Sequence, residues 1–322
     1  MPTDKDFDFG GGNVESVSTP PNVTPQYTDE HVSSESTSSS QPVTSISGKG
    51  NRLDAATINV EITDQEKPIV ILFGPSMCGK TMTLVRLTRY LSNKFTFSPD
   101  KSFKDSNDDE YDALCEHFNS AVDSDNAADG TRYIDFMLLR VNEKRGKTFC
   151  QFVESPGEFL FDPDNKDEDF PAYFDTIRGS NNRKIWIFFL EPTLSSSDKR
   201  AYVRKITEDI VFGREDRFIF LVNKIDMRAT RHLMTTMETI DEDGLRNYVE
   251  KEFKGLVDCE KFVIHRTWRG DKELFKLVGF QTGTYKEGKD KDGNKYKTFQ
   301  AGHNSHPQRL WEAIEGAVNG DW

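Results

Sequence analysis

The sequence predicts an α/β fold whose sheet is mostly parallel, with one antiparallel strand and helices on both faces. Three wholly apolar runs are typical of strands buried on both faces, at residues 69–73, 185–190 and 218–222. Segments with helical periodicity separate these runs along the chain. Strands that alternate with helices favour a sheet with a helical layer on each side. We therefore expect a three-layer sandwich.

The first half of the predicted domain contains the antiparallel part of the sheet. Residues 58–62 alternate apolar and polar side chains and predict an edge strand, and the helical pattern that follows begins at Lys80. An acidic insert with a short helix inside it is expected at about 98–130. Residues 132–141 and 147–155 predict two strands joined by the turn NEKRG, which indicates an antiparallel hairpin.

The second half predicts further helices and one late strand. Helical patterns cover residues 171–179, 198–211, 228–256 and 305–320. In the last of these, Ser305 is the predicted cap and Gly320 the predicted stop. A strand is expected at 276–286, and residues 285–297, with Asp-Gly at their centre, predict a hairpin tip.

The composition along the chain predicts one tail and one domain. Residues 1–52 are rich in Ser, Thr, Pro, Gly and acidic residues without a hydrophobic period, so we expect a disordered tail. Residues 53–322 are expected to form a single domain. Two solvated inserts interrupt it, at about 98–130 and 160–170.

Charge and composition disfavour two classes of partner. The chain has 54 acidic and 42 basic residues and a formal net charge of −12, which argues against nucleic-acid binding through phosphate contacts. The longest apolar runs are far shorter than the roughly 20 residues that span a bilayer, so no membrane span is expected. Four cysteines without a C-x-x-C pair predict neither a disulfide framework nor a zinc site. Without a targeting signal, a cytoplasmic protein is expected.

A phosphate-binding pattern lies between the first buried strand and the first helix. The motif G-x-x-x-x-G-K-[ST] is matched by Gly74, Pro75, Ser76, Met77, Cys78, Gly79, Lys80 and Thr81. Glycine lets the backbone wrap around phosphates, and successive N–H groups and the helix N-terminus face the anion. Lys80 is expected to neutralise phosphate charge, and Thr81 to offer an oxygen to Mg²⁺.

A second motif, N-K-x-D, directly follows the buried run 218–222 as Asn223, Lys224 and Asp226. With both motifs in this order, the chain resembles the Ras-like, translation-factor-related (TRAFAC) class of P-loop GTPases. The resemblance implies the P-loop NTPase fold, in which Asp226 hydrogen-bonds guanine, Lys224 packs along the base and Asn223 braces the loop. Adenine presents an acceptor where guanine has its ring N–H. Asp226 therefore favours GTP and GDP over ATP.

The family's D-x-x-G segment has its counterpart in residues 154–157. The resemblance implies that the N–H of Gly157 meets the γ-phosphate and that Glu154 acts on Mg²⁺ where the family has Asp. Glu158 stands where many relatives have the Gln that orients the attacking water. A carboxylate accepts from water but cannot donate to the phosphate, so we expect slow hydrolysis.

Two further elements of the family have counterparts in this chain. The switch threonine that closes on Mg²⁺ corresponds to Thr131. The turn that contacts the guanine oxygen corresponds to Gln281 and Thr282, and residues 265–270 are an alternative for it.

These residues predict a GTP-binding protein that hydrolyses GTP slowly to GDP and phosphate with Mg²⁺, as a nucleotide-controlled switch for an effector protein. The expected catalytic group is Lys80, Gly157, Glu158 and Thr131. No arginine occurs between Asp105 and Gly130, so a partner is expected to supply positive charge for fast hydrolysis. Two alternatives stay open: a catalytically impaired GTP-binding scaffold, and an ATP-using P-loop enzyme.

Overall fold

The computed structural model describes residues 59–104, 109–123, 136–227, 229–236, 238–264, 270–289 and 295–321. All of them belong to one unit of the chain, Asn51–Trp322. The predicted tail and Thr131 lie outside the described residues. In the part of the chain that is described, no helix combines the length and hydrophobicity needed to cross a membrane.

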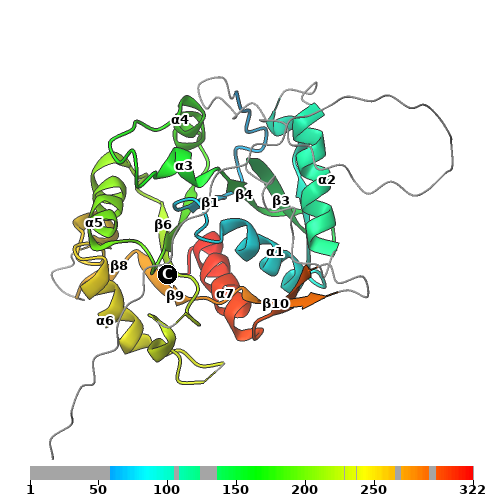
Figure 1. The fold of residues 1–322 in the computed structure, drawn as a ribbon. Helices are drawn as coiled ribbons and strands as arrows, with labels where there is room; N and C mark the ends of the chain where they lie inside the picture. Colours follow the sequence, from blue (N-terminus) through cyan, green and yellow to red (C-terminus); the bar gives the residue numbers. More distant parts are fainter. Residues whose placement is uncertain are drawn as a thin grey trace, which may run out of the picture. The chain divides into compact units, whose positions relative to one another are not determined.

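The main sheet has seven strands in the order β2-β3-β4-β1-β5-β6-β9 (Figure 1). Their bounds are Ile69–Phe73 for β1, Phe95–Pro99 for β2, Met137–Glu143 for β3, Thr148–Glu154 for β4, Lys184–Leu190 for β5, Arg217–Val222 for β6 and Phe275–Gly279 for β9. β3 runs antiparallel to β2 and β4, and the remaining neighbours pair in parallel. The predicted α/β class, mostly parallel with one antiparallel strand, is confirmed.

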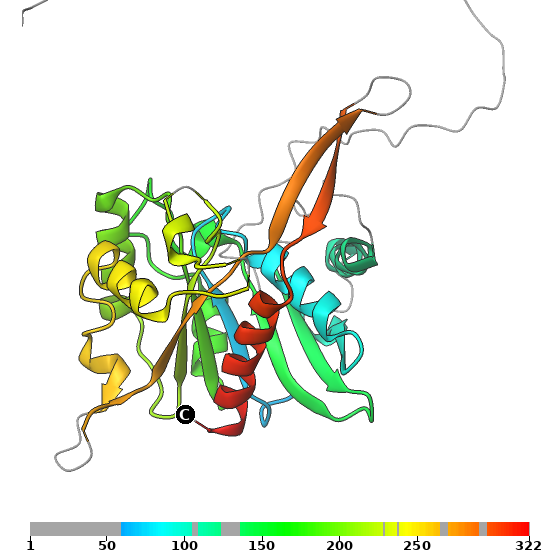
Figure 2. The same ribbon diagram turned by 90° about the horizontal axis from the view of Figure 1, so that it is seen from below.

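Helices cover both faces of this sheet. They are α1 (Lys80–Leu91), α2 (Asp109–Asp123), α3 (Gly157–Leu160), α4 (Ala172–Gly179), α5 (Ser196–Arg204), α6 (Glu242–Glu252) and α7 (Ser305–Asn319). α1 and α7 pack against each other on one face (Figure 2). On the other face, Phe73 of β1 contacts Phe174 of α4 and Tyr202 of α5.

The segment before β1, at residues 58–62, was predicted to be an edge strand, and this prediction is wrong for the described residues. Its described part, from residue 59, forms no strand, although Val60 and Ile62 are buried. Side-chain amides hold it instead: Gln151 Nε2 and Asn182 Nδ2 both donate to the carbonyl of Asp64, at 2.9 and 2.8 Å. Within the predicted strand, the N–H of Glu61 donates to the carbonyl of Phe103 at 3.0 Å. Alternation alone could not distinguish this arrangement from a strand, because isolated contacts to separate parts of the chain replace a strand ladder.

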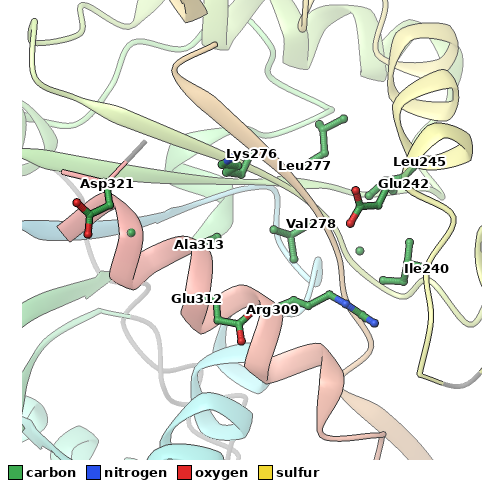
Figure 3. Close-up of a pocket in the computed structure, with 12 residues that line it drawn as sticks. Ile240, Glu242, Leu245, Lys276, Leu277, Val278, Arg309, Glu312, Ala313 and Asp321 are labelled. Atoms are coloured by element: carbon green, nitrogen blue, oxygen red, sulfur yellow. The ribbon is translucent and has the colours of Figure 1, made fainter. Parts of the chain in front are cut away.

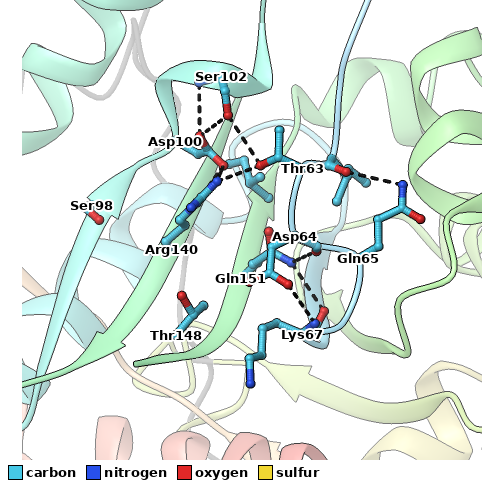
Figure 4. A network of polar contacts seen from close by, with 12 residues as sticks. Thr63, Asp64, Gln65, Lys67, Ser98, Asp100, Ser102, Arg140, Thr148 and Gln151 are labelled. Atoms are coloured by element: carbon cyan, nitrogen blue, oxygen red, sulfur yellow. Dashed lines mark hydrogen bonds and ion pairs between the residues drawn. The ribbon is translucent and has the colours of Figure 1, made fainter. Parts of the chain in front are cut away.

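An ion pair anchors the same segment to the sheet. Arg140 of β3 lies 2.7 Å from the carboxylate of Asp100 and also donates to the hydroxyl of Thr63 at 2.7 Å (Figure 4). Asp100 in turn accepts from the hydroxyl of Ser102 at 2.6 Å. This network fixes the end of β2, a strand that lies partly inside the insert predicted at 98–130.

Two other predictions about elements need correction. Residues 229–236 and 238–241 are mostly irregular rather than helical, and α6 begins only at Glu242, where Asp241 accepts from the N–H of Gly244 at 3.0 Å. The predicted strand 276–286 is split. β9 ends at Gly279, and β10 (Gly283–Lys289) pairs with β11 (Lys295–Ala301) as a separate hairpin that projects from the sheet (Figure 2).

The remaining short elements complete the chain. β7 (Val263–Ile264) and β8 (Lys272–Glu273) pair with each other, and a five-residue π-helical segment, Lys205–Asp209, continues α5. Single 3₁₀ turns lie at Lys101–Phe103, Arg231–Leu233 and Glu260–Phe262. At α7 the cap position is Asn304 rather than Ser305, and the helix ends at Gly320 with φ 82°.

Candidate functional site

The predicted site residues lie where parallel strands end. The phosphate loop follows β1, Glu154 ends β4 and residues 155–157 follow it, residues 223–226 follow β6, and Gln281 follows β9. Because these strands are parallel, their carboxyl ends meet at one edge of the sheet. The topology therefore brings the four predicted segments to the same edge.

The phosphate loop is curled around the amine of Lys80. Lys80 is the first residue of α1, is buried, and donates through Nζ to the carbonyls of Gly74 and Pro75, both at 3.2 Å. Gly79 has φ 92°, and a Cβ there would lie 2.5 Å from Nδ2 of Asn223. Only glycine combines that backbone angle with that close approach.

The guanine motif is bonded directly to the phosphate loop. Asn223, which is buried, donates from Nδ2 to the carbonyl of Cys78 at 2.8 Å. Lys224 donates from Nζ to the carbonyl of Met77 at 3.0 Å. Two successive residues of one motif thus bind two successive carbonyls of the other. The loops that follow β1 and β6 form one unit.

Glu191 is a residue of this unit that sequence reasoning missed. It follows β5, is buried, and its Oε2 lies 2.7 Å from Nζ of Lys224. A carboxylate directly after a fully apolar strand was the available signal. The sequence does not show that β5 and β6 are neighbours, so it could not connect that carboxylate with Lys224.

Asp226 lies beside this unit with its carboxylate available. The residue is half-buried and follows the fully buried Ile225. Among the described residues, its carboxylate has no hydrogen-bond or ion-pair partner. A half-buried carboxylate of this kind can accept two N–H groups from a ligand.

The segment after β4 closes on the other side of the phosphate loop. Thr81 donates through Oγ1 to Oε1 of the buried Glu154. A Cβ on Gly157 would clash with the backbone of Pro75 and Ser76. The chain at residue 157 therefore lies directly against the phosphate loop.

The next residues are held by neighbouring helices. The hydroxyl of Ser155 lies 2.5 Å from the hydroxyl of Tyr173 in α4. Glu158 is in the first turn of α3 and is half-buried. Thus Glu158 lies one residue from the close contact at Gly157.

The donor set at Thr81 and Glu154 fits Mg²⁺. A hydroxyl and a carboxylate are hard oxygen ligands, and the structure brings them into contact. Mg²⁺ is usually bound through one or two carboxylates together with substrate phosphates. No group of three or more His, Cys, Asp or Glu among the described residues could hold a metal, so an all-protein metal cage is not seen there.

Cys78 is a packing residue of the phosphate loop. Burial raises the pKa of its thiol to about 11, although the nearby Lys80 acts in the opposite direction. The thiolate is the reactive form, so this thiol is unreactive near neutral pH.

The predicted contact to the guanine oxygen lies next to the guanine motif. Gln281 is buried two residues after β9, and Phe280 between them donates to the carbonyl of Val222 at 2.9 Å. The alternative at 265–270 follows β7 and precedes β9, and residues 265–269 lie outside the described residues. The structure therefore brings Gln281 and Thr282 to the edge where Asn223 lies.

The acidic stretch at 160–170, predicted as a solvated insert, is fastened to α5 and its continuation. Lys166 pairs with Asp198 at 2.5 Å, and Arg204 pairs with Asp167. Nζ of Lys205 lies 4.3 Å from the ring centroid of Phe170. Residues 164, 165 and 167–169 are exposed, so these contacts hold the stretch from a surface position.

A cavity of about 290 Å³ lies beside β9, and Gly279 at the end of that strand is one of its lining residues. It is bounded by α6, β9 and α7, with Ile240 and Val278 on one side and Arg309 and Glu312 on another (Figure 3). None of its lining residues belongs to the predicted nucleotide site.

This chain has only weak similarity to proteins of known structure. No family model matches the chain, and no match was found among curated proteins. Nucleolar GTP-binding protein 1 from Plasmodium falciparum is 14% identical, with 82% of this chain and 91% of that chain covered and a TM-score of 0.38. The RocCORdC structure of Methanosarcina barkeri Roco2 bound to GDP is 12% identical, with 82% and 52% covered and a TM-score of 0.34. At these TM-scores the likenesses do not assign this chain to a family.

Proposed function

We propose that this chain is a P-loop protein that binds GDP and GTP with Mg²⁺ and hydrolyses GTP slowly. One observation carries the proposal: Asn223 and Lys224 bond to the carbonyls of Cys78 and Met77. Because the two loops are bonded together, a base held by residues 223–226 and phosphates held by residues 74–81 would belong to one ligand. Asp226 beside this junction supplies the acceptor that guanine requires and adenine does not.

The roles of the remaining residues follow from their contacts. The phosphate-loop N–H groups, the N-terminus of α1 and Lys80 bind the phosphates. Thr81 and Glu154 hold Mg²⁺, with Thr131 as the proposed third ligand, and the ion neutralises phosphate charge when bound. Gln281 and Thr282 contact the guanine edge.

Slow hydrolysis follows from the chemistry of Glu158. Its carboxylate accepts a proton or hydrogen bond from water but donates none, and its charge opposes that of the γ-phosphate. Gly157, packed on the phosphate loop, changes its contacts when a γ-phosphate enters, and this change is the proposed signal to an effector protein. A catalytically impaired GTP-binding scaffold would share every binding residue. An ATP-using enzyme would not use Asp226.

The Asp226→Asn variant tests the base assignment. Asn presents an N–H where xanthine has an acceptor, so we expect GDP affinity to fall about a hundredfold and affinity for xanthosine diphosphate to rise. Titration calorimetry with GDP, ADP and xanthosine diphosphate measures all three. Asp243→Asn, which changes an exposed carboxylate at the start of α6, is the matched control. Tighter binding of ADP than GDP by the wild type, or unchanged selectivity in Asp226→Asn, would contradict the proposal.

Hydrolysis is tested separately by single-turnover phosphate release with GTP and Mg²⁺. A rate above that of Lys80→Ala supports the slow GTPase. The same rate in both proteins, with GDP still bound by the wild type, supports the scaffold.

A further inference from the structure

The backbone of Lys224 has an unusual conformation. Its φ of 54° lies in the left-handed region, which residues other than Gly, Asn and Asp seldom adopt. Two side chains hold it there: Oδ1 of Asn223 accepts from the N–H of Lys224 at 2.8 Å, and the hydroxyl of Thr230 donates to its carbonyl at 3.0 Å. The conformation directs the Lys224 side chain towards the phosphate loop, where it meets Met77.

The amine of Lys224 has two different partners. It donates a hydrogen bond to the carbonyl of Met77 at 3.0 Å and forms an ion pair with Glu191, whose Oε2 lies 2.7 Å away. The amine therefore links the end of β5 to the phosphate loop, and the Lys224 stem lies between them.

The carboxylate of Glu191 is also held by contacts that do not involve Lys224. Its Oε1 accepts from the N–H of Thr193 at 3.2 Å and from the Thr193 hydroxyl at 2.6 Å. The strand register pairs Leu190 of β5 with Val222 of β6, so Glu191 and Asn223 leave the sheet as neighbours. The carboxylate thus has a defined position next to the guanine motif.

A buried carboxylate stabilises a fold only when its partners offset the loss of hydration. Glu191 is 4% exposed, whereas Lys224 keeps about a third of its side chain accessible. The carboxylate is therefore the fixed partner and the lysine the adjustable one. This asymmetry is what a positioning residue requires.

We propose that Glu191 is a positioning residue for guanine-nucleotide binding, which holds Lys224 so that its stem and the Asp226 carboxylate face the base together. The inference rests on the proposed function and deepens it. Glu191 touches neither base nor phosphate, and acts through Lys224 alone.

The chain offers a matched control for this ion pair. Lys199 of α5 pairs with Glu252 of α6, also at 2.7 Å and with the lysine buried. Neither residue follows a strand at the nucleotide edge. Glu252→Gln therefore removes the same kind of charge pair without touching the guanine motif.

The experiment is a double-mutant cycle read out by GDP affinity. Glu191→Gln keeps the size of the side chain and can still bond to Thr193, but it loses the charge that holds Lys224. We expect GDP affinity to fall about tenfold, because the ion pair that holds the Lys224 amine beside the phosphate loop is lost. In a Lys224→Ala background, Glu191→Gln should change GDP affinity by less than about twofold. Glu252→Gln should stay within about twofold of the wild type.

Several outcomes decide the matter. Equal losses from Glu191→Gln with and without Lys224 would show a general structural role and overturn the proposal. So would an unchanged GDP affinity in Glu191→Gln when the wild type binds GDP. A wild type that binds no GDP would overturn the proposed function first. If Glu191→Gln does not fold, Thr193→Ala removes one of the two hydrogen bonds to the carboxylate while keeping its charge, and an affinity loss of about threefold that disappears with Lys224→Ala supports the inference.

Discussion

The two sides of the phosphate loop are built differently. On the base side, Asn223 and Lys224 bond to loop carbonyls at 2.8 and 3.0 Å, and Glu191 fixes Lys224 at 2.7 Å. On the γ-phosphate side, the described contacts are the Thr81–Glu154 hydrogen bond and the close approach of Gly157.

Under the proposed function, this difference assigns nucleotide binding and GTP hydrolysis to different sides of the phosphate loop. Contacts through backbone carbonyls on the base side do not depend on the identity of the loop side chains. The other side depends on Gly157, which has no Cβ, and on two glutamates. Glu154 replaces the Asp of D-x-x-G, and Glu158 stands where many relatives have Gln. Under the proposed function, we therefore expect nucleotide binding to tolerate substitutions in the loop better than hydrolysis does.

The largest effect is expected where both sides meet, at Lys80. Lys80→Ala removes a buried amine that bonds two loop carbonyls, and GDP and GTP affinity should fall by at least about a hundredfold. Titration calorimetry measures this loss. Lys94→Ala, which removes an exposed amine just after α1, should leave affinity unchanged. Comparable losses in both variants would mean that Lys80 has no special role.

Gly157→Ala should affect the γ-phosphate side alone. Its Cβ would meet the Pro75 and Ser76 backbone, so residue 157 must move away from the loop. We expect GTP affinity to fall about tenfold and GDP affinity to change by less than about threefold. Gly179→Ala, with no atom within 4 Å of the added Cβ, is the control. Equal losses of GDP and GTP affinity would show that the two sides are not separable.

Glu158→Gln should raise hydrolysis without changing binding. The amide can donate to a phosphate oxygen and removes a negative charge, so the single-turnover rate should rise about tenfold. Glu208→Gln, an exposed glutamate in the segment after α5, should show the wild-type rate. A slower rate in Glu158→Gln would instead indicate that the carboxylate acts as a base.

The smallest expected effect concerns the stability of the loop at high pH. Burial raises the pKa of Cys78 to about 11, so between about pH 9 and 11 the unfolded chain binds fewer protons at this thiol than the folded chain. The free energy of unfolding should therefore decrease as pH rises, by about 1 kcal/mol at about pH 10. Urea titrations at several pH values measure this. The decrease should be smaller in Cys78→Ala, and an identical pH dependence would contradict the assignment.

The features that could be predicted from sequence are local ones. An unbroken apolar run such as Ile69–Phe73 needs no partner to indicate a buried strand, and the glycine pattern of the phosphate loop specifies its own backbone. β2 and the segment at 59–62 were misjudged because their structure depends on distant partners. Arg140 fixes Asp100 from another strand, and Gln151 and Asn182 bind the backbone of Asp64.

The site shows the same limit. Asn223 and Asp226 were found because their motif is contiguous, whereas Glu191 lies 32 residues before Asn223 in the sequence. Only the pairing of Leu190 with Val222 brings its carboxylate to Lys224. A motif search can identify residues that contact a ligand, but residues that orient those residues are specified by sheet order.

The β10–β11 hairpin has a consequence for engineering. It leaves the domain after Thr282 and returns at Gly302, whose N–H donates to the carbonyl of Thr282 at 3.3 Å. Arg86 of α1 anchors the return by donating to the Gly302 carbonyl and to Asn304, both at 2.7 Å. The two ends already meet, so a short turn could replace residues 283–301 without displacing β9 or α7. The hairpin can thus be excised at a pre-closed junction, and its excision separates whatever it contributes from the properties of the core.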